Sequence, residues 1–366
     1  MEYICQIFTG GWHNSNYTAR QIIERLETVT ALVPVKKVII GWNIDSDLYR
    51  AVGTYLHDKG IAMLLWLPAF SEIQSLKEAD DALDIFGKPI ADFALQEGES
   101  FAFCCPSSKK NIRNVFSVYE EYFSGIPFDG VFLDKIRTQS FAAGTMGVLS
   151  CGCERCRKIY KDKGLSLDMF AKKYADTKDR IFDMEEYDPV KGFRFRDKDT
   201  QAFFTIKSEI VADSVHELCR YFKAKGMEVG LDLYAPLMSG IVGQDYPSIA
   251  AEADFIKPML YRKTEAPAGI GFEYGLFRNS VPKAQGMPAF TYDESFLQEQ
   301  LLSFRDVRCA KYPGIEINYR EDIARTDPEY IRSSLSVFKE CGMDGAVLSW
   351  DVMLAPDSHL QAASEV

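Results

Sequence analysis

Short apolar runs alternate with longer amphipathic stretches along this chain, which is the pattern expected of parallel βα units. The apolar runs that predict β-strands are Tyr3–Thr9, Lys37–Trp42, Ile61–Leu67, Phe128–Asp134, Glu228–Tyr234, Asp254–Tyr261, Gly314–Tyr319 and Gly345–Asp351. Eight strands is the number that closes a parallel barrel. The pattern therefore predicts an α/β protein with a (β/α)8, or TIM, barrel.

The amphipathic stretches between these runs predict helices. The clearest are Thr18–Thr28, Ser46–Lys59, Lys109–Ser124, Thr200–Lys225 and Pro328–Cys341. The last two run into Gly226 and Gly342, and a glycine in the left-handed conformation is a common helix stop. Two connections, 68–108 and 138–199, are too long to be simple turns. We expect one domain over residues 1–366, with an inserted segment at about 138–199 and long loops after strands 3 and 4.

Composition narrows the function classes. Hydrophobic residues make up 47% of the chain and charged residues 26%, as in soluble globular proteins. A net charge of −11 without a Lys/Arg-rich block argues against nucleic acid as a partner. No apolar run approaches the roughly 18 residues of a membrane span, and the start MEYICQIFTGGW lacks the features of a signal peptide. We expect a cytoplasmic protein with no nucleic-acid or membrane partner; the sequence does not indicate an oligomeric state.

All four tryptophans of the chain lie at or just past the end of a predicted strand. If the strands form one barrel, Trp12, Trp42, Trp66 and Trp350 gather on one rim, where flat indole faces can stack on sugar rings. Trp12 and Trp42 are the firmer candidates, because Trp66 and Trp350 sit within their strands and alternation allows them to pack behind the rim.

Charged residues interrupt several of the apolar strands near the same rim. Alternation in FDGVFLD places Gly130, Phe132 and Asp134 on one face of strand 4. The same parity brings four further charged residues toward that rim: Asp232, Lys257, Glu316 and Asp351. Buried strand positions normally exclude charge, so this convergence favours a functional site. The alternatives are helix caps and, for Glu316, an ion pair with Lys257 or Arg262.

Three stretches, CCPSSKKNIRNVF, FDGVFLDKIR and CGCERCRKIY, resemble a set of glycoside hydrolases with a (β/α)8 barrel, related in layout to the α-amylase and α-galactosidase superfamily. The resemblance implies a glycosidase in which Asp134, at the end of strand 4, is the nucleophile. It does not indicate the second carboxylate that glycosidic cleavage needs as a proton donor. For that role we rank Glu316 first, Asp232 second and Asp351 third.

We expect this enzyme to cleave a short saccharide or glycoside without a cofactor for catalysis. Its predicted substrate contacts, besides the tryptophans, come from the ends of the predicted strands. They are His13, Asn43, Arg137, Tyr234, Lys257, Tyr261, Asn318 and Asp351.

A second constellation consists of cysteines. Cys151, Cys153 and Cys156 form a C-x-C-x2-C run in the segment after strand 4, and a Cys104–Cys105 doublet precedes helix Lys109–Ser124. Three thiolates and one from the doublet, which we take to be Cys105, are the ligand set of a structural zinc site. Nine cysteines in total fit reduced thiols or a metal better than a disulfide framework. Free thiols that happen to cluster are the alternative.

Two other functions stay open. Lys257 could form a Schiff base with a carbonyl substrate, which would make the protein an aldolase-type lyase. The same aromatic rim could also bind a carbohydrate without cleaving it, because a barrel fold does not by itself specify chemistry.

Overall fold

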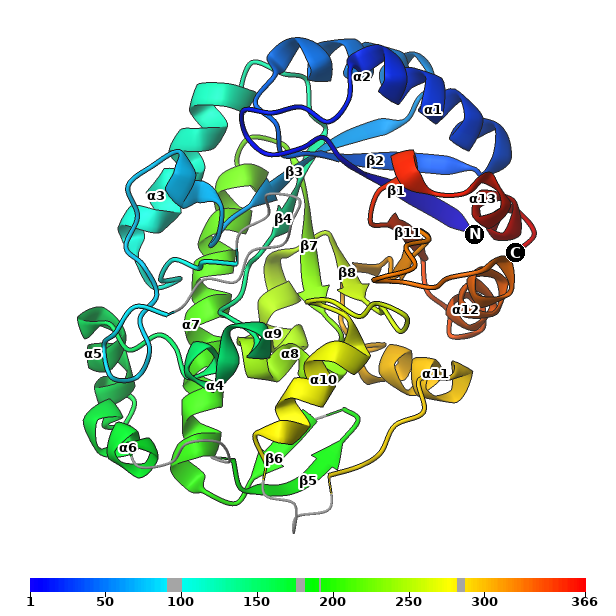
Figure 1. The fold of residues 1–366 in the computed structure, drawn as a ribbon. Helices are drawn as coiled ribbons and strands as arrows, with labels where there is room; N and C mark the ends of the chain where they lie inside the picture. Colours follow the sequence, from blue (N-terminus) through cyan, green and yellow to red (C-terminus); the bar gives the residue numbers. More distant parts are fainter. Residues whose placement is uncertain (91–100, 176–181, 191, 282–286) are drawn as a thin grey trace.

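A closed ring of eight parallel strands forms the centre of the protein (Figure 1). The computed structural model describes residues 1–366 except 91–100, 176–181, 191 and 282–286. The ring consists, in order, of β1 (Glu2–Phe8), β2 (Val35–Gly41), β3 (Ala62–Pro68), β4 (Gly130–Asp134), β7 (Glu228–Tyr234), β8 (Phe255–Met259), β10 (Gly314–Glu316) and β11 (Gly345–Ser349). β10 closes it by pairing with both β11 and β8. The predicted (β/α)8 fold is confirmed, with each strand inside or close to its predicted run.

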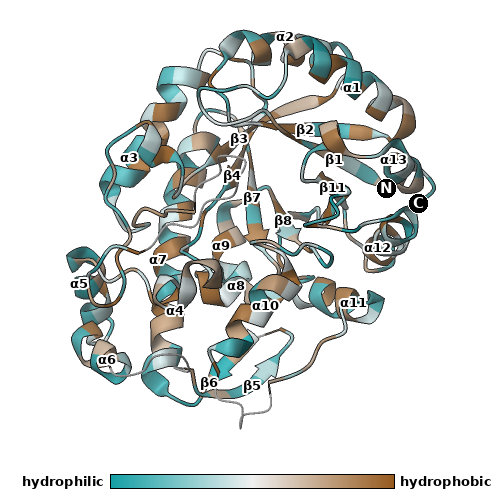
Figure 2. Ribbon diagram, in the orientation of Figure 1, coloured by the Kyte–Doolittle hydropathy of each residue, from teal (hydrophilic) through white to brown (hydrophobic). Residues whose placement is uncertain are grey.

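Helices surround the ring and connect its strands. The longer ones are α1 (Ala19–Leu32), α2 (Ser46–Asp58), α3 (Lys109–Val118), α7 (Lys198–Lys223), α10 (Ile270–Asn279), α11 (Glu294–Ser303), α12 (Pro328–Glu340) and α13 (Asp357–Ser364). Most begin at a side-chain cap, such as the capping box of Thr18 and Gln21 in α1. Gly226 and Gly342 follow α7 and α12 with φ of 78° and 71°, as the helix-stop prediction requires. Figure 2 shows hydrophobic residues along the barrel strands and mixed faces on the outer helices.

Shorter elements fill the connections. They are η1 (Ile73–Ser75), the π-helical η2 (Tyr119–Phe123), η3 (Phe141–Ala143), α4 (Gly144–Val148), α8 (Pro236–Ser239), η4 (Gly240–Val242), α9 (Tyr246–Ile249), η5 (Ala250–Glu252), β9 (Ala310–Lys311) and η7 (Val352–Leu354). β9 pairs with β8 beside the ring. These elements bring no further strand into the barrel itself.

The two long connections lie against each other beyond the carboxyl ends of β3 and β4. The inserted segment contains α5 (Glu154–Asp162), α6 (Leu167–Tyr174) and a hairpin of β5 (Met184–Asp188) and β6 (Gly192–Phe195). Asp84 forms an antiparallel bridge with Ser150, and the Gly152 N–H donates to Leu83 O at 2.8 Å. Part of each connection, 91–100 and 176–181 with 191, lies outside the described residues. The two connections together build one wall above the barrel.

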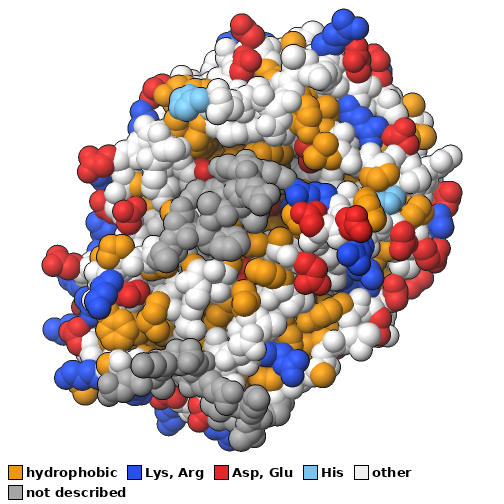
Figure 3. Space-filling model, viewed as in Figure 1, with side chains coloured by type: hydrophobic (Ala, Val, Ile, Leu, Met, Phe, Trp, Pro, Cys, Tyr) orange, Lys and Arg blue, Asp and Glu red, His pale blue; other side chains and the backbone are white. Residues whose placement is uncertain are grey.

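The ends of the chain meet on the side of the barrel away from this wall (Figure 1). The Tyr3 hydroxyl donates to Ala363 O at 2.6 Å, so α13 is fastened to β1. Figure 3 shows acidic and basic side chains interspersed over the coloured part of one face. Across the described ranges, no helix combines the length and apolar character needed to cross a membrane.

The close approach of β4 and β7 gives a stability test. A Cβ on Gly130 would lie 2.5 Å from the backbone oxygen of Glu228, which the paired strand cannot easily move. We expect Gly130→Ala to lower the free energy of unfolding by about 1–3 kcal/mol, measured by urea denaturation.

The matched control is Gly275→Ala in α10, where an added Cβ meets nothing within 4 Å. This change should be neutral or stabilising by up to about 1 kcal/mol, because alanine is the better helix former. Equal destabilisation by both variants would contradict the register of β4 and β7.

Candidate active site

A cavity of about 400 Å³ opens at the carboxyl ends of the barrel strands, within the size range of small-molecule sites. The predicted residues that line it are Trp42, Trp66, Asp134, Arg137, Asp232, Tyr234, Lys257, Tyr261, Asn318, Trp350 and Asp351. The predicted residues that do not line it are Trp12, His13, Asn43 and Glu316. The barrel thus brings most of the predicted set to one place.

Asp134 occupies the end of β4, at the edge of this cavity. One carboxylate oxygen accepts the indole N–H of Trp66 at 2.9 Å, and the other accepts the backbone N–H of Lys135. The side chain remains partly exposed. Two fixed donors therefore orient a carboxylate that solvent or substrate can still reach.

Asp232 on β7 stands beside Asp134. Leu133 is paired with Leu231, and one residue further along both strands come Asp134 and Asp232. The Asp232 carboxylate accepts from the Lys257 ammonium at 3.1 Å, with side-chain exposures of only 3% and 1%. Its other oxygen, Oδ1, is buried and has no hydrogen-bond partner in the described part of the chain. One oxygen is held in place and the other is available for a proton.

The environment of this pair shifts both pKa values. Burial raises the pKa of Asp232 to about 7; Lys257 opposes this shift, and the charge of Asp134 adds to it. Burial alone would lower the pKa of Lys257, but Asp232 and Tyr261 raise it above its usual value. Lys257 also donates to Gln6 at 3.0 Å. Lys257 therefore stays a cation, whereas Asp232 exchanges a proton near neutral pH.

Aromatic rings form a wall of the cavity next to Asp134. The ring of Trp42 lies 5.7 Å from that of Trp66 and 5.1 Å from that of Phe8, each pair edge to face. The ammonium of Lys135 sits 4.7 Å from the Trp42 ring and pairs with Glu72 at 2.8 Å. Both indoles line the cavity but are largely buried, Trp42 with 3% and Trp66 with 8% exposure, so they offer little open ring surface beside the carboxylates.

Aromatic and acidic residues also line the cavity near the end of β11. Trp350 lies 6.5 Å from Tyr261, ring to ring. Burial raises the pKa of Asp351 to about 7, against the lowering effect of hydrogen bonds from the Met353 N–H and the Tyr17 hydroxyl. Asn318 accepts the N–H groups of Trp350 and Asp351, so it fixes the backbone of this strand end.

Arg137 is clamped between two aromatic rings. Its guanidinium lies 4.5 Å from the rings of both Phe103 and Tyr234. The Tyr234 hydroxyl donates to buried Glu273 at 3.1 Å, and Ser140 donates to the same carboxylate oxygen. This polar cluster holds a cation in a fixed orientation in the cavity lining.

Glu316, which the sequence ranks first as proton donor, is engaged behind the cavity. Its carboxylate accepts the backbone N–H of Lys263 at 2.6 Å and the hydroxyl of Tyr330 at 2.9 Å. Burial raises its pKa to about 7. β10 ends at Glu316, so alternation deduced from a longer strand does not describe its side chain. In this position the carboxylate ties the segment after β8 to α12.

The other predicted contacts outside the cavity have local partners. The Trp12 indole N–H donates to Glu72 O at 3.1 Å, and the ring is buried. The Asn43 side chain donates to Gly11 O and accepts from the Asp45 N–H, which stabilises the turn after β2. His13 is exposed in the same region.

Several cavity residues were not predicted. They include Gln6, Phe8, Tyr17, Phe101, Lys135, Thr264 and Arg320. Gln6 is a polar residue inside the apolar run YICQIFT, and the parity rule used for Lys257 would have found it. Tyr17 and Thr264 lie in loops, where no periodic signal marks a side chain that points inward.

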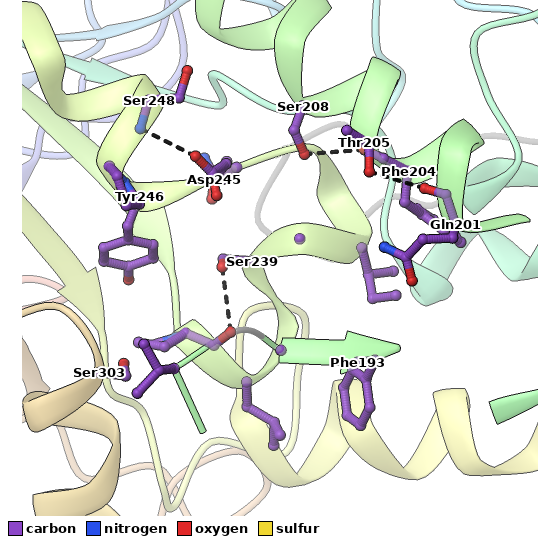
Figure 4. Close-up of a pocket in the computed structure, with 18 of the residues that line it drawn as sticks. Phe193, Gln201, Phe204, Thr205, Ser208, Ser239, Asp245, Tyr246, Ser248 and Ser303 are labelled. Carbon is purple, nitrogen blue, oxygen red and sulfur yellow. Dashed lines mark hydrogen bonds between the residues drawn. The ribbon is translucent and has the colours of Figure 1, made fainter. Parts of the chain in front are cut away.

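A second cavity, of about 490 Å³, lies between the β5–β6 hairpin, α7, α8 and α9 (Figure 4). Its polar side chains mostly serve the local backbone. Ser208 donates to Phe204 O, Ser239 donates to Pro236 O, and Asp245 accepts the Ser248 N–H. The two carboxylates in its lining are engaged as well, Asp245 as the cap of α9 and Glu209 in an ion pair with Lys163.

The thiols of Cys105, Cys151, Cys153 and Cys156 meet at a single point outside the barrel cavity. Their sulfur atoms all lie within 4.8 Å of one another, close enough to hold one metal ion. Cys104, the other member of the doublet, is buried and does not belong to this group.

Comparison with known proteins supports the fold. The chain resembles the PgaB (BpsB) glycoside hydrolase domain from Bordetella bronchiseptica, with a TM-score of 0.63, 15% identity, and coverage of 99% of this chain and 98% of that chain. It also resembles alpha-L-fucosidase isoenzyme 2 from Paenibacillus thiaminolyticus, with a TM-score of 0.58, 12% identity, and coverage of 100% and 49%. No family model and no curated protein matches the sequence. The protein therefore shares the barrel of known glycoside hydrolases.

Proposed function

We propose that this protein is a glycoside hydrolase that cleaves a short saccharide or glycoside with Asp134 and Asp232. The observation that carries the proposal is the placement of the two carboxyls side by side on paired strands, at the edge of a cavity with a tryptophan wall. The structural likeness to a glycoside hydrolase domain and a fucosidase agrees with this chemistry.

Asp134 is the nucleophile in this mechanism. Its carboxylate attacks the anomeric carbon and forms a glycosyl ester, while the glycosidic bond breaks and Asp232 gives its proton to the leaving oxygen. In the second step Asp232 takes a proton from a water molecule. The oxygen of that water attacks the anomeric carbon, and the ester bond to Asp134 breaks. Both carboxyls return to their starting protonation states.

We assign the proton donor to Asp232 in preference to Glu316 and Asp351. Asp232 neighbours Asp134 and has a buried, unpartnered oxygen. Glu316 does not line the cavity, and Asp351 follows β11, on the opposite side of the ring. Asp351, Arg137 and the stacked aromatic side chains then bind the sugar.

The geometry disfavours the lyase alternative. A Schiff-base lysine must be neutral to attack a carbonyl group, and Lys257 is buried in an ion pair with Asp232. Binding of carbohydrate without cleavage is also compatible with the aromatic wall. A protein with that function would show no turnover of glycosides.

We propose no cofactor for the chemistry, since two carboxyls suffice for hydrolysis. The cysteine cluster lies outside the cavity, so a metal bound there would not touch the substrate. We propose the cytoplasm as the compartment, because the nine cysteines are all unpaired and a reducing environment maintains free thiols.

Asp134→Asn should lower kcat/KM at least about a thousandfold on aryl glycosides, because an amide cannot form the glycosyl ester. The measurement is chromogenic release across a panel of nitrophenyl sugars. Asp45→Asn, which keeps a good cap on α2, is the control and should retain activity. Activity of Asp134→Asn at the level of the control would refute the assigned nucleophile.

Asp232→Asn should lose about 10²- to 10⁴-fold on substrates with a poor leaving group and much less on nitrophenyl glycosides, whose leaving group needs no proton. In the unaltered protein, kcat/KM should fall as pH rises through about 7, since the donor must be protonated. Asp232→Asn should lack this basic limb.

Glu316→Gln is the matched comparison, because burial also raises the pKa of Glu316 to about 7. This variant should keep the basic limb and the leaving-group dependence. If the limb disappears in Glu316→Gln and survives in Asp232→Asn, the proton donor is Glu316.

The stereochemistry gives a further test. Paired strands lie about 4.8 Å apart, close to the roughly 5–5.5 Å carboxyl separation of retaining enzymes and below the roughly 6.5–9.5 Å of inverting ones. We expect the first product to keep the anomeric configuration of the substrate, as followed by proton NMR during early turnover. Inversion would exclude the covalent mechanism while leaving hydrolysis intact.

A further inference from the structure

We propose that Cys105, Cys151, Cys153 and Cys156 bind one zinc ion as a tetrahedral four-thiolate site that fastens together the two long loops above the barrel. The site is separate from the proposed catalytic carboxyls and does not depend on their chemistry.

The thiols converge from separate parts of the chain. Cys105 precedes α3, whereas Cys151 and Cys153 precede α5 and Cys156 lies in its first turn. The Cys105 sulfur lies 3.6 Å from that of Cys153 and 3.5 Å from that of Cys156. Three of the four are buried and Cys153 is partly buried. This enclosure leaves little room for water at a bound ion, as in structural zinc sites.

Backbone hydrogen bonds hold these segments independently of any ion. The Cys105 N–H donates to Asp80 O at 2.8 Å, and the Asn111 side chain donates to Asp80 O and Cys105 O. On the other loop, the Arg157 guanidinium donates to Gly152 O at 2.8 Å and to Ile85 O. The thiols therefore meet in a framework that is already organised, which favours metal binding.

Lys207 supplies an independent observation. Its ammonium is buried and donates to Val148 O and Ile241 O, with the rings of Phe203 and Phe204 each 5.0 Å away. No carboxylate pairs with it among the described residues. Burial lowers the pKa of Lys207 to about 7, and the charge of Cys151 opposes this shift. A buried cation needs a counter-charge.

A four-thiolate zinc site provides that counter-charge. Four thiolates and one Zn²⁺ carry a net charge of about −2. Lys207 balances part of this charge from one side. The positive N-terminal end of α5 also balances part of the negative charge. Cys153 caps that helix, and its sulfur accepts the Cys156 N–H. With neutral thiols beside it, burial alone would act on Lys207 and favour its uncharged form.

Zinc fits better than the other metals that favour sulfur. A tetrahedral set of four thiolates suits zinc or iron. Zinc does not change its oxidation state, which suits an ion with a purely structural role. Such a shell has no open coordination position, so the ion takes no part in the hydrolysis. Its role is mechanical, since it joins the loop after β3 to the loop after β4.

The first test measures metal in the full chain, purified under reducing conditions without chelator. We expect about one zinc per chain by elemental analysis and four sulfur ligands at about 2.3 Å by zinc X-ray absorption. Nitrogen or oxygen ligands, iron in place of zinc, or protein that takes up no zinc when it is added would each overturn the proposal. This measurement uses the unaltered protein, so the test stays valid even if a cysteine variant fails to fold.

The second test uses matched cysteine variants. Cys153→Ser should reduce bound zinc to below about a tenth per chain, because the ligand shell is incomplete. Cys104→Ala, one residue from a ligand, and Cys309→Ser, remote from the cluster, should keep about one zinc per chain. Full zinc in Cys153→Ser, or its loss in Cys309→Ser, would overturn the assignment.

A third test addresses the structural role. Removing the ion with a chelator under reducing conditions should lower Tm, and added Zn²⁺ but not Mg²⁺ should restore it, because magnesium prefers oxygen ligands. An unchanged Tm after verified removal would contradict a structural role. The result is independent of glycosidase activity, so failure of this proposal and failure of the proposed function can be told apart.

Discussion

β10 pairs with β11 over three residues and touches β8 through Gly314 and Met259, and this short contact completes the ring of strands. Glycine at position 314 leaves room for the Lys257 side chain beside this contact. A Cβ there would lie 2.6 Å from the Lys257 side chain. Closure brings the carboxyl ends of all eight strands to one rim. Everything proposed for the cavity depends on that rim, since Asp134, Lys257 and Trp350 come from distant parts of the sequence.

The sequence predicts the ring well because burial on both faces of a parallel strand leaves a strong apolar signal. It also predicts Asp134, Asp232 and Lys257 as neighbours, since these residues lie within or at the end of paired strands where alternation holds. Glu316 shows the limit of this rule. β10 ends there, and hydrogen bonds from Lys263 and Tyr330, which belong to other segments of the chain, decide where the carboxylate goes. Loop residues such as Tyr17 and Thr264 carry no periodic signal at all.

Charges in the cavity are mostly paired within the protein. Lys257 pairs with Asp232, Lys135 with Glu72, and Arg320 with Asp322. Asp134 instead accepts from two N–H groups, one from Trp66. A carboxylate held by neutral donors keeps more of its nucleophilic character than one neutralised by a cation, and it leaves space on its open side. This difference agrees with the roles proposed for the two acids, attack for Asp134 and proton transfer for Asp232.

The cysteine cluster and the cavity are linked through a short stretch of backbone. Cys105 follows Phe103 by two residues, and the Phe103 ring packs on the guanidinium of Arg137 in the cavity lining. In its described part, the loop that carries Phe103 forms isolated bridges rather than a strand, among them Ser71 with Phe103 and Asp81 with Cys104. The proposed metal crosslink at Cys105 would therefore restrain this part of the cavity wall. Long loops give a barrel its specificity, and an ion that joins two of them fixes their shape without occupying the site.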